Sequence, residues 1–427
     1  MNRLILTLLT MAMAPLSCIA GITLDYCLSK AEENYPLIKR YALVEKTADL
    51  NLSDINKGWL PRIGVYGQVS AQNAVPAFPA SLQEILSKLG QETDGLGHIQ
   101  YKIGADVSQT IWDGGASRAQ RKVERASAAQ TQASLSVQMY AVREKVMNLF
   151  FGILLIDKQI EQTENTISLL TANRTLMESM LKNGTAMQAD IDMIEAQRLS
   201  MSQTLTQAKS TEKAYRDLLA IYIGENLDNI NLEKPEAEMP ADLGAARPEL
   251  NLFESQRSLN RARETAVKSS VMPRIGLFAQ AYYGYPGLNY FESMISRDFS
   301  FNVLAGVKLS WNLDSFYTKK NSLRKLAIAN EGIENDREVF LFNTRLQTSS
   351  QTETIDGLRA IMSDDARIVD LRSNVRKAAE SRLRNGVIDA TALLVKITDE
   401  NQARLTAAYH EIQLIQSIYK LKNIINR

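Results

Sequence analysis

The sequence predicts a mixed α and β membrane protein built from an internal duplication. Three observations predict this class. Short motifs recur in the same order in both halves of the chain, two stretches of nearly seventy residues contain no proline and almost no glycine, and four segments of about ten residues alternate apolar and polar side chains. Proline-free stretches are typical of long helices, whereas alternation with period two is typical of β-strands.

Composition excludes several classes of protein. The chain of 427 residues carries 49 Lys and Arg against 48 Asp and Glu, so its net charge of +1 gives no indication of a nucleic-acid partner. Two Cys and two His are too few for a Cys/His zinc cluster within one chain. We expect Gly95–Gly97 to be a flexible extracellular loop and not a nucleotide site, His98 and His410 to be solvated or packed, and Asp364–Asp365 to be a solvated pair. We therefore expect no enzymatic activity, no cofactor and no metal.

Residues 1–20 are typical of a secretory signal peptide, because a basic residue, an apolar run and a small terminal residue follow one another. The alternative is a lipoprotein signal that uses Cys18. After cleavage at residue 20, Cys27 is the only thiol. An export signal combined with so little cysteine indicates a bacterial envelope protein. No later stretch supplies the roughly 18 to 20 apolar residues of a transmembrane helix.

The internal repeat divides the rest of the chain. Four landmarks recur in order: 34–38 with 246–250, 61–64 with 273–276, Trp112 with Trp311, and 181–184 with 383–386. The spacing between landmarks places a longer loop between Pro61 and Trp112 than in the second half. We expect a first repeat over 21–222, a connection over 223–247 and a second repeat over 248–427.

Long helices are expected over about 115–182 and about 316–384. At about 1.5 Å per residue, each would extend on the order of 100 Å. Each ends at an Asn-Gly pair, where the left-handed conformation stops a helix. Further helices are expected before each hairpin and over about 187–222 and about 388–425. The helix over 187–222 carries a coiled-coil seam of apolar residues at spacings of three and four.

The β-hairpins are expected over about 61–111 and about 273–311. Their strands have about ten residues with apolar side chains at alternate positions, which is the length of a tilted transmembrane strand. A soluble antiparallel sheet is the alternative. Aromatic residues crowd the second hairpin loop, where an interfacial girdle would lie. They are Tyr282, Tyr283, Tyr285, Tyr290, Phe291 and Phe299.

Four strands are too few to close a membrane barrel, because lipid tolerates no open sheet edge and common outer-membrane barrels need about eight strands. Chains must therefore share one barrel. A trimer with a 12-stranded β-barrel, four strands per chain, is compatible with this count and leaves room for an aqueous lumen. The helices that follow the strands would continue this wall as a long α-helical coiled-coil barrel.

The residues resemble the TolC family of outer-membrane efflux proteins. Ile22–Leu28 with Asn34–Ile38 is similar to the amino-terminal signature of that family. Lys182–Gln197 and Arg384–Asn401 are similar to its two periplasmic turns, and the acidic, proline-containing segment 224–248 is similar in position to its equatorial connection. The resemblance covers essentially the whole chain after residue 20 and includes the order of elements.

The resemblance implies a homotrimer in the bacterial outer membrane, in contact with outer-membrane lipid, with its helical barrel in the periplasm. It implies an exit duct that receives cargo from a periplasmic adaptor protein and an inner-membrane transporter. Two further interpretations stay open: a conduit of a type I protein secretion system, and an exported coiled-coil scaffold or adhesin with a soluble head. The adaptor would dock on the two turns, at Asn183, Gly184 and Thr185 and at Asn385, Gly386 and Val387.

The family also places acidic rings at the closed periplasmic end. Asp190, six residues after Gly184, occupies the position of a gate aspartate, and Asp192 and Asp389 lie nearby. Ala392 and Val395 occupy the places of the second pair, so we expect a sparser ring than in other members, one that favours cations. The alternative for Asp190 is a carboxylate in the first turn of a helix, stabilised by the helix dipole.

Overall fold

The computed structural model describes residues 21–91, 95–228 and 230–426. The predicted signal peptide and Cys18 lie outside the described residues. The chain divides into two compact units, which are described separately. Unit 1 comprises Met1–Tyr41, Ser134–Leu250 and Arg337–Arg427, and unit 2 comprises Ala42–Ala133 and Asn251–Asp336.

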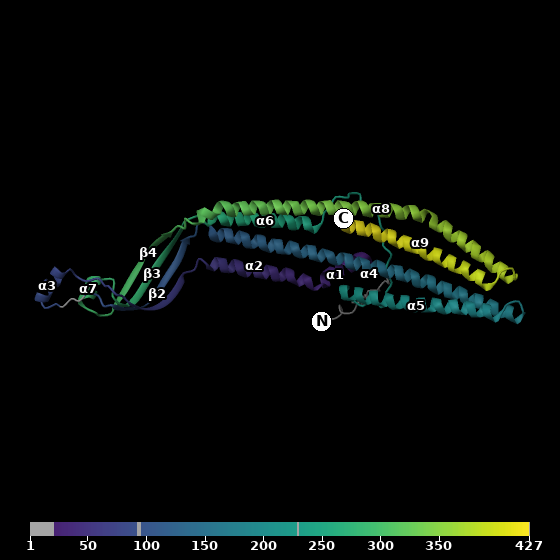
Figure 1. The fold of residues 1–427 in the computed structure, drawn as a ribbon, viewed down its shortest axis with the longest axis horizontal. Coiled ribbons are helices and arrows are strands. Elements are labelled where there is room, and N and C mark those ends of the chain that lie inside the picture. The colour runs from purple at the N-terminus through teal and green to yellow at the C-terminus, as the bar shows by residue number, and fades with distance from the viewer. Residues whose placement is uncertain (1–20, 92–94, 229, 427) are drawn as a thin grey trace, which may run out of the picture. The chain divides into compact units, whose positions relative to one another are not determined.

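The two halves of the chain repeat one order of elements, and the first half begins with an additional helix and a 3-10 turn (Figure 1). The first half contains α1 (Leu24–Asn34), η1 (Pro36–Ile38), α2 (Lys39–Lys57), β1 (Arg62–Ala71), α3 (Ala80–Lys88), β2 (Ile99–Trp112), α4 (Ala116–Lys182) and α5 (Gln188–Ile223). The second half contains α6 (Pro248–Ser269), β3 (Arg274–Tyr285), α7 (Tyr290–Ile295), β4 (Ser300–Ser310), α8 (Ser315–Arg384) and α9 (Ala390–Ile425). Each half runs from a helix through two strands with a short helix between them to a long helix and its partner.

The predicted mixed α and β class is confirmed. Helices α4 and α8 contain 67 and 70 residues, because neither stretch contains proline, the strongest helix breaker. The four strands form one antiparallel sheet in unit 2 with the order β1-β2-β3-β4. None of the described helices combines the length and the apolar character needed to cross a membrane.

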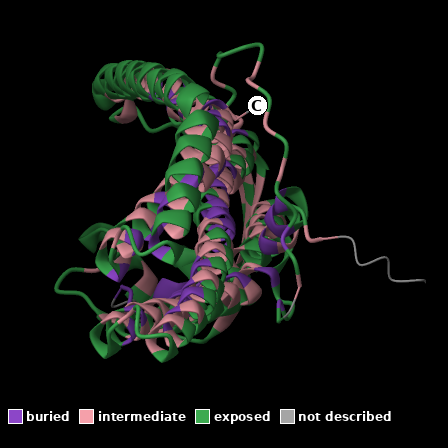
Figure 2. Cartoon of the chain, turned by 90° about the vertical axis from the view of Figure 1, so that its right-hand side faces the viewer, coloured by how far each residue is buried: buried purple, intermediate pink, exposed green. Residues whose placement is uncertain are grey.

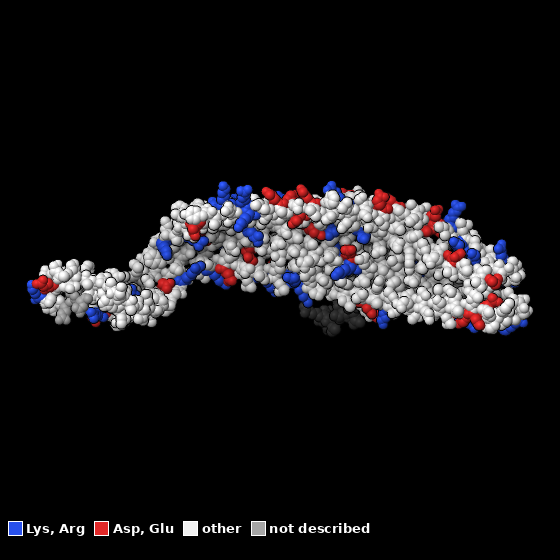
Figure 3. Space-filling view, in the orientation of Figure 1, with Lys and Arg blue, Asp and Glu red and all other residues white. Residues whose placement is uncertain are grey.

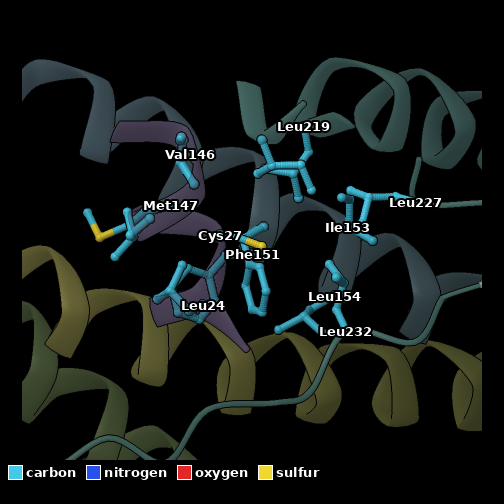
Figure 4. Close-up of a cluster of buried hydrophobic side chains, with 14 of the residues drawn as sticks. Leu24, Cys27, Val146, Met147, Phe151, Ile153, Leu154, Leu219, Leu227 and Leu232 are labelled. Atoms are coloured by element: carbon cyan, nitrogen blue, oxygen red, sulfur yellow. The ribbon is translucent and has the colours of Figure 1, made fainter. Parts of the chain in front are cut away.

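The main core of unit 1 lies where α1 packs between α4, α5 and α9 (Figure 4). Phe150, Phe151 and Ile153 of α4 are completely buried there, as is Cys27 of α1. Burial in this apolar core, with a smaller contribution from the negative charge of Glu225, raises the pKa of the Cys27 thiol to about 12. The thiol therefore stays protonated and unreactive at neutral pH.

Helix α8, in contrast, is exposed along most of its length. Exposed residues cover much of the chain in Figure 2. Within unit 1 this helix carries large apolar side chains that are about half exposed, at spacings of three, four or seven residues over much of their run. They are Val339, Phe342, Leu346, Ile361, Ile368, Leu371 and Val375. We call them the α8 stripe. Such a stripe is typical of a coiled-coil seam whose partner helix is not part of the same chain.

Two sequence-based expectations are wrong. The Gly95–Gly97 segment is packed and not free in solvent, because Leu96 is 2% exposed and the Tyr285 hydroxyl accepts a hydrogen bond from the Gly97 backbone at 2.7 Å. Asp365 is not a solvated carboxylate either. Its Oδ2 lies 2.8 Å from Nδ1 of His410 on α9, and both side chains are mostly buried.

Candidate functional site

One face of the sheet is apolar and exposed. The register aligns Ile63, Val107, Ala279 and Ala305 in one row across the four strands, and Val65, Ala105, Ala281 and Val303 in the next. Because side chains alternate between faces, the odd-numbered residues of these strands share this side. Within this chain Val65 is 80% exposed. An exposed apolar face that covers a whole sheet indicates contact with an apolar environment.

Aromatic residues mark both ends of the apolar face. At the end next to the helices, a bulge between Thr110 and Trp112 brings Trp112 opposite Ile275, on the apolar side. Trp311, 55% exposed, follows β4 at the same end. At the other end Phe301 and Tyr283 lie opposite each other. Two aromatic bands that flank an apolar surface are typical of strands that span a bilayer.

The predicted aromatic girdle is only partly correct. Tyr283, Tyr290, Phe291 and Phe299 are exposed, as a girdle requires. Tyr282 lies instead on the opposite face of β3, opposite Asn302, and Tyr285 is buried against Leu96 and Met294. Their distribution depends on how the two hairpin loops pack, which the local sequence does not reveal.

The other face of the sheet is predominantly polar. Even-numbered positions place Asp106 beside Gln280, and Tyr66 in a row with Tyr282. The Gln280 amide donates a hydrogen bond to the Tyr66 hydroxyl at 2.6 Å. On the side shown in Figure 3, both Lys or Arg and Asp or Glu side chains appear where the strands join the helices. Apolar exposure on one side and hydrogen-bonding groups on the other are the pattern of a strand between lipid and an aqueous lumen.

The sheet does not close on itself. In the strand order β1-β2-β3-β4, β1 and β4 each pair with one neighbour only among the described residues. Each therefore presents an edge of unpaired backbone N–H and C=O groups. In a bilayer such an edge must pair with another strand, because each unsatisfied group costs several kcal/mol.

The first predicted turn joins α4 to α5 in unit 1. Gly184 has φ of +75°, and its backbone N–H donates to the Leu181 carbonyl at 3.0 Å. The Thr185 N–H donates to the Met180 carbonyl at 2.9 Å. These two bonds form a Schellman motif, which satisfies carbonyls at the helix end and requires the left-handed conformation that glycine adopts readily.

The second turn, between α8 and α9, repeats this geometry. Gly386 has φ of +69°, its N–H donates to Leu383 at 2.9 Å, and the Val387 N–H donates to Arg382 at 2.9 Å. Asn183 and Asn385 immediately precede the two glycines, and the Asn385 amide donates to the Ser381 carbonyl at 2.9 Å.

The two turns lie side by side at one end of unit 1. They line a shared hollow of about 420 Å³ that includes Gly184, Thr185, Gly386 and Val387. Beneath it, side chains of α4, α5, α8 and α9 form a common apolar core, with Leu170, Ile194 and Leu393 fully buried. Met187 and Val387 remain 73% and 68% exposed at this end. This end of unit 1 therefore exposes apolar side chains above a packed core.

The predicted gate carboxylates lie next to these turns, and two of them accept backbone hydrogen bonds at the start of a helix. Oδ2 of Asp190 accepts a hydrogen bond from the Met187 backbone N–H at 3.0 Å. Asp389 is the N-cap of α9 and accepts from the Ala392 N–H at 2.8 Å. Asp192 accepts from the Gln188 amide at 2.8 Å. Asp190 also lines the hollow between the turns, so its local capping bond and a role at the tip are compatible.

Sequence reasoning missed an ion-pair network near each turn. In the second half, Glu400 of α9 accepts hydrogen bonds from Arg376 of α8 and from Arg404. Although burial raises the pKa of Glu400, these bonds outweigh it, so the pKa is lowered.

In the first half, Glu195 pairs with Arg198 at 2.6 Å and with Arg174 at 3.5 Å. The internal repeat could have revealed these networks, because Arg174 and Arg376 are 202 positions apart, which is the shift that also relates the two turns. These networks link the paired helices just before each turn.

The described residues contain no group of three or more His, Cys, Asp and Glu side chains that is placed to hold a metal ion.

Sequence comparison finds no relative: no protein-family model matches the chain, and no curated protein does. Comparison of the fold finds solved structures with a similar architecture. The chain is similar to the outer membrane protein VceC from Vibrio cholerae, with a TM-score of 0.66 and 12% identity over 94% of this chain and 95% of that one.

It is also similar to CusC, whose crystal structures concern folding and transmembrane channel formation. The TM-score is 0.68, with 13% identity over 94% of this chain and 91% of that one. The open state of the Neisseria gonorrhoeae MtrE outer membrane channel matches with a TM-score of 0.63 and 13% identity over 94% and 88%. The TolC-type outer-membrane channel fold that the sequence resemblance implied is therefore confirmed.

Proposed function

We propose that this chain, which has the fold of TolC-type outer-membrane channels, is the outer-membrane exit duct of a bacterial tripartite efflux system. It conducts solutes passively from a periplasmic adaptor and an inner-membrane transporter to the exterior. The observation that carries this proposal is the sheet, which presents a largely exposed face that is apolar except for Gln109 on one side and a predominantly polar face on the other. A soluble adhesin head would have to leave that apolar face in water, which is unfavourable.

A homotrimer would cover the two surfaces of the chain that lack a partner, namely the open edges of the sheet and the α8 stripe. Pairing β4 of one chain with β1 of the next closes a barrel of twelve strands, which removes every open edge from the lipid. The α8 stripe supports the same assembly in unit 1, since a neighbouring chain can cover its half-exposed apolar side chains. In this arrangement the polar face lines the lumen and the apolar face contacts outer-membrane lipid.

The turns at Asn183–Thr185 and Asn385–Val387 are the docking edge for the adaptor in this proposal. Their positive-φ glycines shape the helix ends, while their neighbours Met187 and Val387 expose apolar side chains. The gate residues are Asp190, Asp192 and Asp389, which three-fold symmetry would gather around the axis at the periplasmic end. A narrow ring of carboxylates favours and binds multivalent cations.

The test is to purify the full chain from outer membranes and measure mass and conductance on the same sample. Light scattering should give a trimer, and planar bilayers should show stable open channels. A monomer that conducts by itself would contradict the proposal. Deleting the gene should then sensitise the bacterium to small toxic compounds, whereas loss of a secreted protein without sensitisation would assign the duct to protein secretion.

A further inference from the structure

We infer that the polar face of the sheet carries an anion-binding collar, formed by Arg62 of β1, Arg274 of β3 and Lys308 of β4. The ligand class is solutes with phosphate, sulfate or carboxylate groups that pass through the barrel. This inference rests on the proposed function, because only a closed barrel makes the polar face a lumen.

The register gathers the three cations at one end of the sheet. Arg62 pairs with Ser108, Lys308 pairs with Gly276, and Arg274 pairs with Ser310. All three residues lie at the end of their strands that joins the helices. They occupy even-numbered positions, so their side chains belong to the polar face and not to the apolar face that contacts lipid. All three are exposed.

These side chains line a hollow of about 160 Å³ in the polar face. Hydroxyl-bearing residues contribute to the same wall: Ser108, Thr110 and Ser310. Guanidinium, ammonium and hydroxyl groups are all hydrogen-bond donors, and guanidinium groups bind phosphate and carboxylate with two parallel bonds. No acidic residue lines the hollow. Its chemistry therefore matches an anion.

The charge of the polar face supports this assignment. On this face of the described strands, four residues are cationic, namely the three collar residues and Lys102, and one is acidic, Asp106. Asp106 pairs with Gly64 and Gln280. Lys102 lies farther along β2, with its ammonium 4.9 Å from the centre of the Tyr282 ring. Within the described part of the chain, no carboxylate forms an ion pair with a collar side chain within 4.0 Å. The collar charges are thus free to attract solutes.

Three-fold repetition would place nine such cations near one end of the lumen, in neighbouring rows of the sheet. Like charges that line a narrow, low-dielectric passage create potentials of several kT, which concentrate the opposite ion. Neutralising them should lower the permeability ratio of chloride to potassium on the order of severalfold.

The experiment compares purified wild-type trimers with the triple variant Arg62→Gln/Arg274→Gln/Lys308→Gln in planar bilayers of neutral phosphatidylcholine. Reversal potentials in a KCl gradient give the permeability ratio, and tripolyphosphate added to the extracellular side tests for block. We expect a lower ratio and weaker block in the variant. The charge-conserving variant Arg62→Lys/Arg274→Lys should retain the ratio. Lys88→Gln on α3, which removes a lysine paired with Glu84 at 2.8 Å, is the matched control.

Each outcome is informative. If the triple variant fails to assemble, the three single variants should each lower the ratio. Conducting variants with the wild-type ratio and undiminished block would overturn the collar while leaving the duct intact. Wild-type protein that forms no channel would overturn the proposed function and the collar together.

Discussion

The assignment of the two sheet faces can be tested with one matched pair of substitutions on β4. Val307 belongs to the apolar face and is 68% exposed, whereas Leu304, three residues earlier, belongs to the polar face and is 45% exposed. Both are aliphatic, and both lie in the same strand. Each lysine variant therefore replaces an aliphatic side chain of β4 with a charge, and the two variants differ in the side of the sheet on which that charge appears.

The free-energy cost of each lysine follows from the depth of its residue in the bilayer. Phe301 and Trp311 mark the two ends of the apolar face, and ten residues at about 3.3 Å with a tilt of about 40° span about 25 Å, the height of the apolar band of a membrane barrel. Val307 lies within about 3 Å of the middle on this scale. A lysine there costs about 2–4 kcal/mol per chain, hence about 6–12 kcal/mol per trimer. Leu304→Lys faces water and should cost less than about 1 kcal/mol per chain.

The assay measures the fraction of chain recovered as heat-modifiable trimer in the outer-membrane fraction, followed by the urea midpoint of unfolding in liposomes. Val307→Lys should abolish or strongly reduce trimer recovery, whereas Leu304→Lys should assemble like the wild type. Val307→Ala controls for loss of the apolar side chain. Equal recovery of both lysine variants, or selective loss of Leu304→Lys, would refute the assignment of faces.

Three further predictions concern unit 1. Asp190→Ala should abolish the block of channel current by trivalent cations added from the periplasmic side; unchanged block would leave Asp190 with its capping bond alone. Thr185→Trp and Val387→Trp should leave trimers intact but abolish adaptor cross-linking and drug resistance, and loss of the trimer itself would instead assign the turns a structural role. Because burial raises the pKa of Cys27 to about 12, a maleimide should label it in urea but not in the native trimer between pH 6 and about 9. Rapid labelling of native protein would show that the core around α1 opens.

Features that depend on local sequence could be predicted. Alternation with period two is a local pattern, so four strands were found, and the register then placed the alternate residues of all four on common faces. The Asn-Gly pairs likewise identified the helix ends, because a left-handed residue is a local requirement that glycine meets.

Features that depend on contacts between distant segments could not be predicted. Tyr285 and Leu96 are buried because two hairpin loops pack together, which an aromatic-rich loop sequence does not indicate. Asp365 lies against His410 only because α8 and α9 pair in one register. The collar was missed for a similar reason, since Arg62, Arg274 and Lys308 come together only through the pairing of strands from both repeats.

The central claim is that three chains close one barrel through their free edge strands. The most direct measurement is disulfide cross-linking between neighbouring chains in a Cys27→Ser background, with a single cysteine at Ala305 of β4 combined in turn with single cysteines along β1. At the correct register, oxidation in outer membranes should give covalent dimers and trimers and nothing larger, because the third bond closes the ring. A ladder that continues beyond three chains, or the absence of any β1 to β4 cross-link, would contradict the account.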